Sequence, residues 1–168
     1  MFCIESKTKE WVVEKLANGD LDFSYISLIR VDLSDLNFSG ANFNESNLYG
    51  CRFNECDCSG ASFRGANLNC AYFKDANLKN CDFSTLKAHE RDKNRIIGAE
   101  LGRMYDKRTT ASHSKFDRSN MFGANMSGVE LDYTSFDGAN LEWDTPITAC
   151  KMGFICDFDN TILEKRRK

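Results

Sequence analysis

The sequence predicts an all-β solenoid of four-sided coils, and two regular patterns carry this prediction. Large apolar side chains recur every five residues from Phe23 to Phe83, and twelve of these thirteen positions hold leucine or phenylalanine. Residue types also recur at a spacing of twenty, as in Phe23, Phe43 and Phe63. A helix repeats about every 3.6 residues and a strand every two, so neither keeps a five-residue series on one face. Stacked coils with four five-residue sides do so, and backbone hydrogen bonds can join them.

A second inward position lies two residues before each large one. From Leu21 to Cys81 it holds only small or aliphatic residues, so a large and a small side chain fill the interior of each side. Asparagines between the two inward positions are expected to hydrogen-bond the turn backbone; they are Asn37, Asn42, Asn47, Asn67 and Asn77. Glycines two residues after the large position are expected at corners with positive φ; they are Gly40, Gly50, Gly60 and Gly65.

The array needs a cover at its start, because an open coil exposes unpaired backbone groups. Residues 1–19 are predicted to supply it as an N-terminal capping helix. Trp11, Val12 and Leu16 share one stripe of this helix, and Gly19 marks its end. Residues 20–84 then form the first β-helix block.

The five-residue pattern stops after Phe83 and resumes at Phe116. Residues 85–113 between them are a basic insertion whose apolar spacing predicts an amphipathic helix; the residues are Ile97, Leu101, Met104 and Tyr105. This helix packs on the solenoid or also contacts a partner, and both readings stay open. Residues 114–163 form the second block with a C-terminal cap, and residues 164–168 form a basic tail. Trp143 or Phe154 covers the last coil or lies at a homodimer contact through the C-terminal end.

The units GANF, ESNL, GASF, GANL, CAYF, DANL and NCDF resemble the repeats of the pentapeptide repeat family. The resemblance implies a right-handed quadrilateral β-helix. It also implies a class of function, since well-studied members resemble duplex DNA in size, shape and charge. Those members bind DNA gyrase or topoisomerase IV, and some confer quinolone resistance through loops that interrupt the helix.

The eight cysteines are expected to be free thiols. Cys51, Cys56, Cys58 and Cys81 occupy inward positions, and none of them lies twenty residues from another. The chain has no CxxC motif and no histidine at zinc-site spacing, so we expect neither a metal nor a cofactor. Buried thiols act as small apolar groups, and the cysteines expected at the surface, Cys3, Cys70 and Cys150, indicate a reducing compartment. With no long apolar run and no signal peptide, a cytoplasmic protein is expected, or one exported by a route without such a signal.

One motif imitates an enzyme. MGFICDFDNTIL resembles the opening DxDxT motif of haloacid-dehalogenase phosphatases. The resemblance would make Asp157 the nucleophile, Asp159 the acid and base, and Thr161 a phosphate contact. Only five residues follow this stretch, which leaves no room for the catalytic domain, and the same letters fit two pentapeptide units. We therefore expect a non-catalytic protein.

Charge is unevenly distributed along the chain. The two β-helix blocks carry net charges of −4 and −5, whereas the insertion and the tail carry +3 each. The twenty-residue rule places Asp35, Glu55 and Asp75 at one corner, and Asp137 would join them if the insertion preserves the register. We predict that these three carboxylates bind a partner together with basic residues of the insertion; the latter are Arg91, Lys93, Arg95, Arg103 and Arg108.

Two functions fit this charge pattern. In the first, the acidic β-helix presents a DNA-like surface to a bacterial DNA-binding enzyme such as DNA gyrase or topoisomerase IV, which it inhibits or protects. In the second, the protein is an interaction scaffold or a secreted effector with a different protein partner. Neither function requires direct nucleic-acid or membrane binding. An acidic set on one continuous face favours the first, and a dispersed set favours the second; the set is Asp32, Asp35, Glu45, Glu55, Asp57, Asp75 and Asp82.

Overall fold

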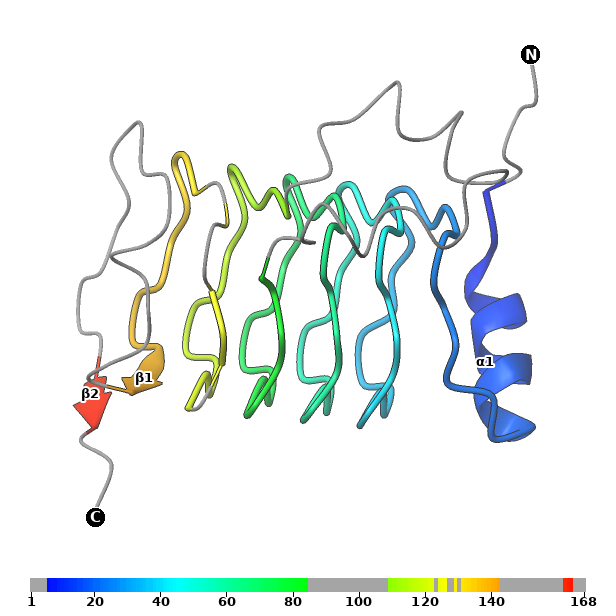
Figure 1. The fold of residues 1–168 in the computed structure, drawn as a ribbon, viewed down its shortest axis with the longest axis horizontal. Coiled ribbons are helices and arrows are strands. Elements are labelled where there is room, and N and C mark those ends of the chain that lie inside the picture. Colours follow the sequence, from blue (N-terminus) through cyan, green and yellow to red (C-terminus); the bar gives the residue numbers. More distant parts are fainter. Residues whose placement is uncertain are drawn as a thin grey trace.

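The computed structural model describes residues 6–84, 109–122, 124–126, 129, 131–142 and 162–164. Its named elements are α1 (Lys9–Ala17), β1 (Asn140–Glu142) and β2 (Ile162–Glu164). Between α1 and β1 the chain winds through stacked coils that form a rod (Figure 1). Helix α1 lies at one end of the rod, and β1 and β2 lie at the other.

Isolated parallel bridges, rather than long strands, join each coil to the next. The first coil has four sides, residues 21–25, 26–30, 31–35 and 36–40, here called sides 1 to 4; equivalent residues of later coils keep these names. One residue of each side bridges to the residue twenty positions later, and the four ladders start at Asp22, Ser27, Asp32 and Asn37. Strand β1 extends the fourth ladder by pairing with β2 in parallel, Asn140 with Ile162. The four-sided coil predicted from the twenty-residue period is therefore present.

Two columns of stacked phenylalanine rings fill much of the interior. Neighbouring rings of the first column have centroids 5.0 Å apart; the members are Phe23, Phe43, Phe63 and Phe83. Neighbouring rings of the second are 4.9, 5.1 and 5.2 Å apart; the members are Phe53, Phe73, Phe116 and Phe136. The columns meet edge to face, with 5.8 Å between the centroids of Phe63 and Phe73. All eight rings are fully buried. The distances within the first column confirm that its rings stack, as the twenty-residue period predicts.

The outward asparagines stabilise the turns as expected. The side-chain oxygen of Asn37 accepts from the backbone N–H of Ser39 at 2.9 Å, two residues further on. The side-chain amide of Asn42 also donates to the carboxylate of Asp22 in the preceding coil, at 3.1 Å. These side chains therefore satisfy turn donors within one coil and connect one coil to the next.

The corners require the left-handed backbone conformation. Gly40 and Gly60 have φ of 71° and 69°, as predicted for corner glycines. Eleven non-glycine residues of the described chain also have positive φ; they are Tyr25, Arg30, Asp35, Glu45, Glu55, Cys70, Asp75, Asn80, His113, Arg118 and Tyr133. Such a conformation costs an L-residue roughly 1–2 kcal/mol. The corners therefore accept side chains at an energetic cost, and they are the outermost points of the coil.

The insertion interrupts a single coil between its first and second sides. Bridged residues are twenty positions apart elsewhere but 43 apart across the insertion, as in Asn67 and Thr110, so the insertion adds 23 residues. The Thr109 hydroxyl donates to the carbonyl of Ser84 at 3.2 Å and accepts from the N–H of Gly65 at 2.8 Å. The coil thus restarts at Thr109, before the predicted boundary at residue 114. The five-residue pattern missed this side because its large inward position holds a small residue, Ala111.

Helix α1 packs its apolar stripe on the first coil. The Thr8 hydroxyl caps its N-terminus by accepting from the N–H of Trp11 at 3.4 Å. Val12 is fully buried, and the Trp11 ring meets Phe23 edge to face at 6.3 Å. Gly19 follows the helix with a φ of 73°. A helix is therefore present within the segment 1–19, and its role as a cap stays a prediction.

Candidate functional site: an acidic corner of the rod

The three carboxylates predicted to bind a partner share one corner of the rod. The backbone N–H groups of Asp35, Glu55 and Asp75 donate to carbonyls of the following coil, at 3.0, 2.9 and 3.0 Å. All three residues are exposed and have φ between 59° and 67°. Coils are about 5 Å apart, as the 5.0 Å between the rings of Phe43 and Phe63 indicates. The corner therefore presents one carboxylate per coil at this spacing.

Beyond the insertion the corner changes residue type. Its next occupants are Arg118 and Gly138, because the N–H of Arg118 donates to the carbonyl of Asp137 and the register is shifted by 43 residues. The expectation that Asp137 shares the column is therefore wrong by one position. Asp117 and Asp137 lie directly before this corner in the fourth and fifth coils. We call the resulting row of carboxylates the acidic ridge; its members are Asp35, Glu55, Asp75, Asp117 and Asp137.

Arg118 ties the two halves of the acidic ridge together. Its guanidinium lies 2.5 Å from the carboxylate of Asp75, which belongs to the coil before the insertion. This hydrogen bond, and the nearby charges of Asp75, Asp117 and Asp137, raise the pKa of Arg118. The arginine is thus held as a cation among carboxylates, and it reduces the net negative charge of the ridge.

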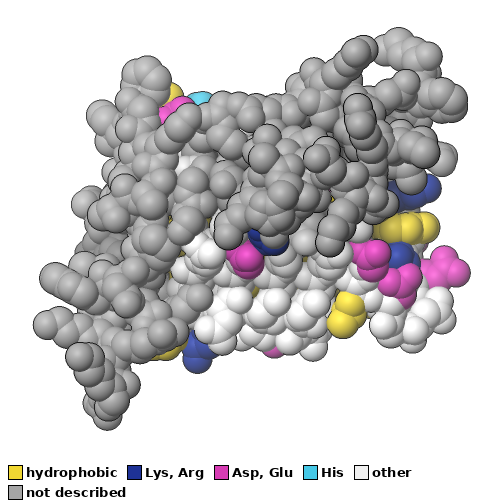
Figure 2. Space-filling view, viewed as in Figure 1, with side chains coloured by type: hydrophobic (Ala, Val, Ile, Leu, Met, Phe, Trp, Pro, Cys, Tyr) yellow, Lys and Arg dark blue, Asp and Glu magenta, His cyan; other side chains and the backbone are white. Residues whose placement is uncertain are grey.

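The other acidic residues do not extend this row. Asp82 lies on side 1 and Glu45 at the corner after side 1, whereas Asp57 lies on side 4. Asp32 on side 3 faces the Arg52 guanidinium at 3.7 Å. The face in Figure 2 likewise shows acidic and basic side chains scattered over the part of the surface that is coloured. The acidic set is therefore split between the ridge and other sides.

Several predicted features lie outside the described residues. These include the amphipathic helix of the insertion, with Arg91, Lys93, Arg95, Arg103 and Arg108, and the C-terminal Trp143 and Phe154. The phosphatase-like residues Asp157, Asp159 and Thr161 also fall there. The backbone immediately after them, β2, pairs with β1 and continues the fourth ladder. This pairing agrees with the pentapeptide interpretation of the motif.

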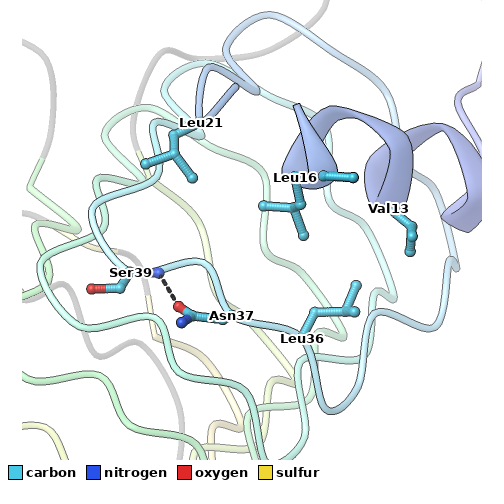
Figure 3. A pocket seen from close by; sticks show the side chains of 7 residues that line it. Val13, Leu16, Leu21, Leu36, Asn37 and Ser39 are labelled. Atoms are coloured by element: carbon cyan, nitrogen blue, oxygen red, sulfur yellow. Dashed lines mark hydrogen bonds between the residues drawn. The ribbon is translucent and has the colours of Figure 1, made fainter. Parts of the chain in front are cut away.

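A hollow beside α1 was not predicted from the sequence (Figure 3). It has a volume of about 560 Å³ and is lined mainly by apolar side chains of α1 and the first coil, including Val13, Leu16, Leu21 and Leu36. Val13 and Leu21 are 43% and 39% exposed. The apolar stripe of the helix predicts that Val12 is buried. It does not predict which part of the first coil α1 leaves uncovered.

The inward cysteines are free and buried, as predicted. Cys51, Cys56, Cys58 and Cys81 form no disulfide, and Cys70 is a partly exposed free thiol. Burial raises the pKa of Cys51 and of Cys81 to about 12, so both remain protonated at neutral pH. In the described part of the chain, no group of three or more His, Cys, Asp or Glu side chains could hold a metal ion. Within the same residues, no helix is long and apolar enough to cross a membrane.

The stacked four-sided coils define a β-helical repeat protein. The sequence matches the family described as Pentapeptide repeats, in 8 copies, over residues 20–55, 46–84 and 107–142. Since these matches cover more than half of its length, the chain belongs to the pentapeptide repeat family, whose members form right-handed β-helices. No curated protein matches the chain.

Three solved structures illustrate the similarity. HetL, a pentapeptide repeat protein involved in heterocyst differentiation regulation in the cyanobacterium Nostoc, is 13% identical over 84% of this chain and 65% of its own, with a TM-score of 0.38. A thylakoid lumen protein of Arabidopsis thaliana is 24% identical over 74% of this chain and 63% of its own, with a TM-score of 0.21. QnrB1, a plasmid-mediated fluoroquinolone resistance protein, is 17% identical over 85% of this chain and 79% of its own, with a TM-score of 0.21. This chain thus spans less than two thirds of the first two proteins, and no function is transferred from any of the three.

Proposed function

We propose that this protein is a non-catalytic binding protein whose acidic ridge engages lysine and arginine side chains of a protein partner. The narrower form of the proposal is that the partner is a bacterial DNA-binding enzyme such as DNA gyrase or topoisomerase IV, whose phosphate-binding groups the ridge occupies. The observation that carries the proposal is the regular spacing of carboxylates along one edge of the rod, one per coil from Asp35 to Asp137.

Charge spacing supports a phosphate-like role and also limits it. The ridge offers a carboxylate about every 5 Å, the coil spacing, whereas each strand of duplex DNA offers a phosphate about every 3.4 Å. Lys74 and Arg118 lie beside the ridge and partly neutralise it. The ridge therefore resembles one weakly charged strand rather than a whole duplex. Binding that depends on it should weaken as salt rises, because screening reduces exposed charge–charge attraction.

The ridge can be tested by neutralising it without changing its shape. The variant D35N/E55Q/D75N removes three charges, and its asparagines tolerate the positive φ of the corner. The matched control D22N/E45Q/D82N removes three charges from side 1 and its corner. We expect the ridge variant to bind the partner more weakly and with less salt dependence, and the control to bind like the native protein. Equal losses in both variants would mean that only the overall charge matters.

The insertion can be tested separately because the coil closes without it. Replacing residues 85–108 by one glycine restores a coil of twenty residues, and glycine suits the positive φ of a corner. Ser84 and Thr109, which already share a hydrogen bond, would then flank that glycine. We expect a folded rod that has lost partner selectivity, since insertions in repeat arrays commonly form part of the binding face.

The partner class is tested by titrating the protein into a DNA supercoiling assay with gyrase, with and without a fluoroquinolone. The narrower proposal expects a change in supercoiling or in drug-induced DNA cleavage that the ridge variant lacks and its control keeps. No effect well above micromolar concentration would favour an interaction scaffold or effector with another protein partner. The dispersed positions of Glu45, Asp57 and Asp82 favour that second function.

A further inference from the structure

A second hollow opens at the neighbouring corner of the rod, between sides 2 and 3. Arg30, Gly50 and Cys70 occupy equivalent positions of the first three coils there, with φ of 59°, 68° and 60°. Gly50 has no side chain, and the stem of Arg30 from the preceding coil lies against it, because a Cβ added at Gly50 would come within 3.1 Å of Arg30 Cγ. The hollow has a volume of about 370 Å³, and Tyr49 and Arg52 also line it.

The side chains around Gly50 are rich in hydrogen-bond donors and carry net positive charge. The Arg30 guanidinium lies over the ring of Tyr49, 5.8 Å from its centroid, which restricts how it can point. The Arg52 guanidinium faces Asp32 at a long 3.7 Å and is 60% exposed, so most of its N–H groups face the hollow or solvent. Tyr72 completes the wall on the third coil.

The lone carboxylate of the hollow is already engaged by its own turn. One oxygen of Asp32 accepts from the hydroxyl of Ser34 at 2.7 Å and from its N–H at 3.1 Å. These hydrogen bonds lower the pKa of Asp32, so it is ionised and balances only one of the two arginines. Two guanidinium groups against one carboxylate form an environment suited to an added oxyanion.

We propose that this hollow binds the phosphate group of a phosphorylated ligand, held by Arg30 and Arg52, which both line it. Arginine is suited to this role because its planar guanidinium can donate two parallel hydrogen bonds to phosphate. Gly50 matters because a side chain there would press on the stem of Arg30 and move its guanidinium. The site lies one corner away from the acidic ridge and does not depend on the ridge having a partner.

Variants of this corner separate the charge of the arginines from the placement of Arg30. R30Q/R52Q removes both cations and should weaken phosphate binding at least about tenfold, the loss expected when charge-assisted hydrogen bonds are removed. G50N keeps both arginines but displaces the stem of Arg30, whose Cγ would lie 3.1 Å from the added Cβ, and asparagine tolerates positive φ. The control G60N has the same backbone conformation, with φ of 69°, at a corner where an added Cβ meets no atom within 4 Å. A second control, K79Q, removes an exposed cation from side 4.

The probes are inorganic phosphate and phenyl phosphate, titrated into the whole isotope-labelled protein and followed by NMR chemical shifts. We expect saturable shifts around Gly50 that R30Q/R52Q and G50N abolish and that G60N and K79Q retain. Stronger binding of phenyl phosphate would assign the phosphate to an aromatic carrier such as phosphotyrosine, through contact with Tyr72. Equal binding of both probes would mean that the anion alone is recognised. The proposal is overturned if neither probe gives saturable shifts there, or if the shifts survive in both R30Q/R52Q and G50N.

Discussion

The stacked rings of the interior allow a stability change to be worked out for Phe63→Leu. Phe63 is fully buried and has four ring neighbours, two stacked at 5.0 Å and two edge to face at 5.8 and 5.9 Å. Each aromatic pair contributes about 0.5–1.5 kcal/mol beyond the area it buries, so the four together set an upper range of roughly 2–6 kcal/mol. Contacts that share one ring are not additive. We therefore expect a loss of about 3 kcal/mol in the free energy of unfolding, a large part of the roughly 5–15 kcal/mol typical of a folded domain.

Equilibrium unfolding in urea, followed by circular dichroism, measures this loss. With a typical dependence of about 1–3 kcal/mol per molar, the midpoint should fall by roughly 1–3 M. The matched control is Leu68→Met, a volume-conserving change in a neighbouring buried column, which should cost less than about 1.5 kcal/mol. If Phe63→Leu costs no more than this control, the ring columns add nothing beyond apolar volume and the reasoning fails. A fall in the slope instead would mean that the rod unfolds in parts, as repeat arrays can.

Three further predictions concern corners, thiols and acid. Glu55→Gly should raise the free energy of unfolding by up to about 1 kcal/mol, because glycine relieves the strain of a positive φ. Gly60→Ala should lower it by about 1–2 kcal/mol, although the new Cβ meets no atom within 4 Å. Thermal unfolding compares the two variants, and the opposite order of stability would contradict the strain argument. Iodoacetamide at pH 8 should label Cys70 before Cys51 and Cys81, whose pKa values burial raises to about 12, and mass spectrometry that finds Cys81 labelled first would refute this. Hydrogen bonds from Ser59 lower the pKa of Asp57, so the stability that the Asp57 carboxylate adds is present above the ordinary carboxyl pKa of about 4 and is lost as the pH falls through the lowered pKa. D57N should therefore reduce the loss of stability in acid. An acid unfolding profile that D57N leaves unchanged would contradict this prediction.

The interior of the rod could be predicted because it repeats. Each inward position must match its neighbour one coil away, so twenty-residue identities such as Phe23 and Phe43 already imply the stack at 5.0 Å. The position of the insertion was harder to define, because Ala111 at the large inward position is smaller than the pattern requires although it is fully buried. Stacking tolerates a small residue when the adjoining coils keep their bridges, as Asn67 and Thr110 do.

The surface could be predicted only as far as the register was known. Counting by twenty placed Asp35, Glu55 and Asp75 together, and the structure agrees. The expectation for Asp137 failed, because counting by twenty from Asp75 reaches residue 135, and the 23-residue insertion moves the corner to Arg118 and Gly138. The hollow at Gly50 could not be foreseen either, because it depends on which side chains meet across three coils at a corner. Corner glycines were expected for their φ alone, and only the structure distinguishes Gly50, beside Arg30, from the open Gly60.

The five positions of each repeat differ in how strongly the fold restricts their side chains. The two inward positions are fixed by stacking, and the residue between them is engaged in bridges and turn hydrogen bonds, as Asn37 and Asn42 are. The corner residue is the position whose side chain is least constrained by the fold, since the residue before it often accepts a hydrogen bond from the next coil, as Asn44 and Asn54 do. Non-glycine corners carry a backbone cost of roughly 1–2 kcal/mol each. Asp35, Glu55 and Asp75 at one end of side 3, and Arg30 at the other, occupy such corners where glycine would relieve the strain. Charges of opposite sign are thus held at the two edges of a single side, which can orient a partner across the rod as well as along it.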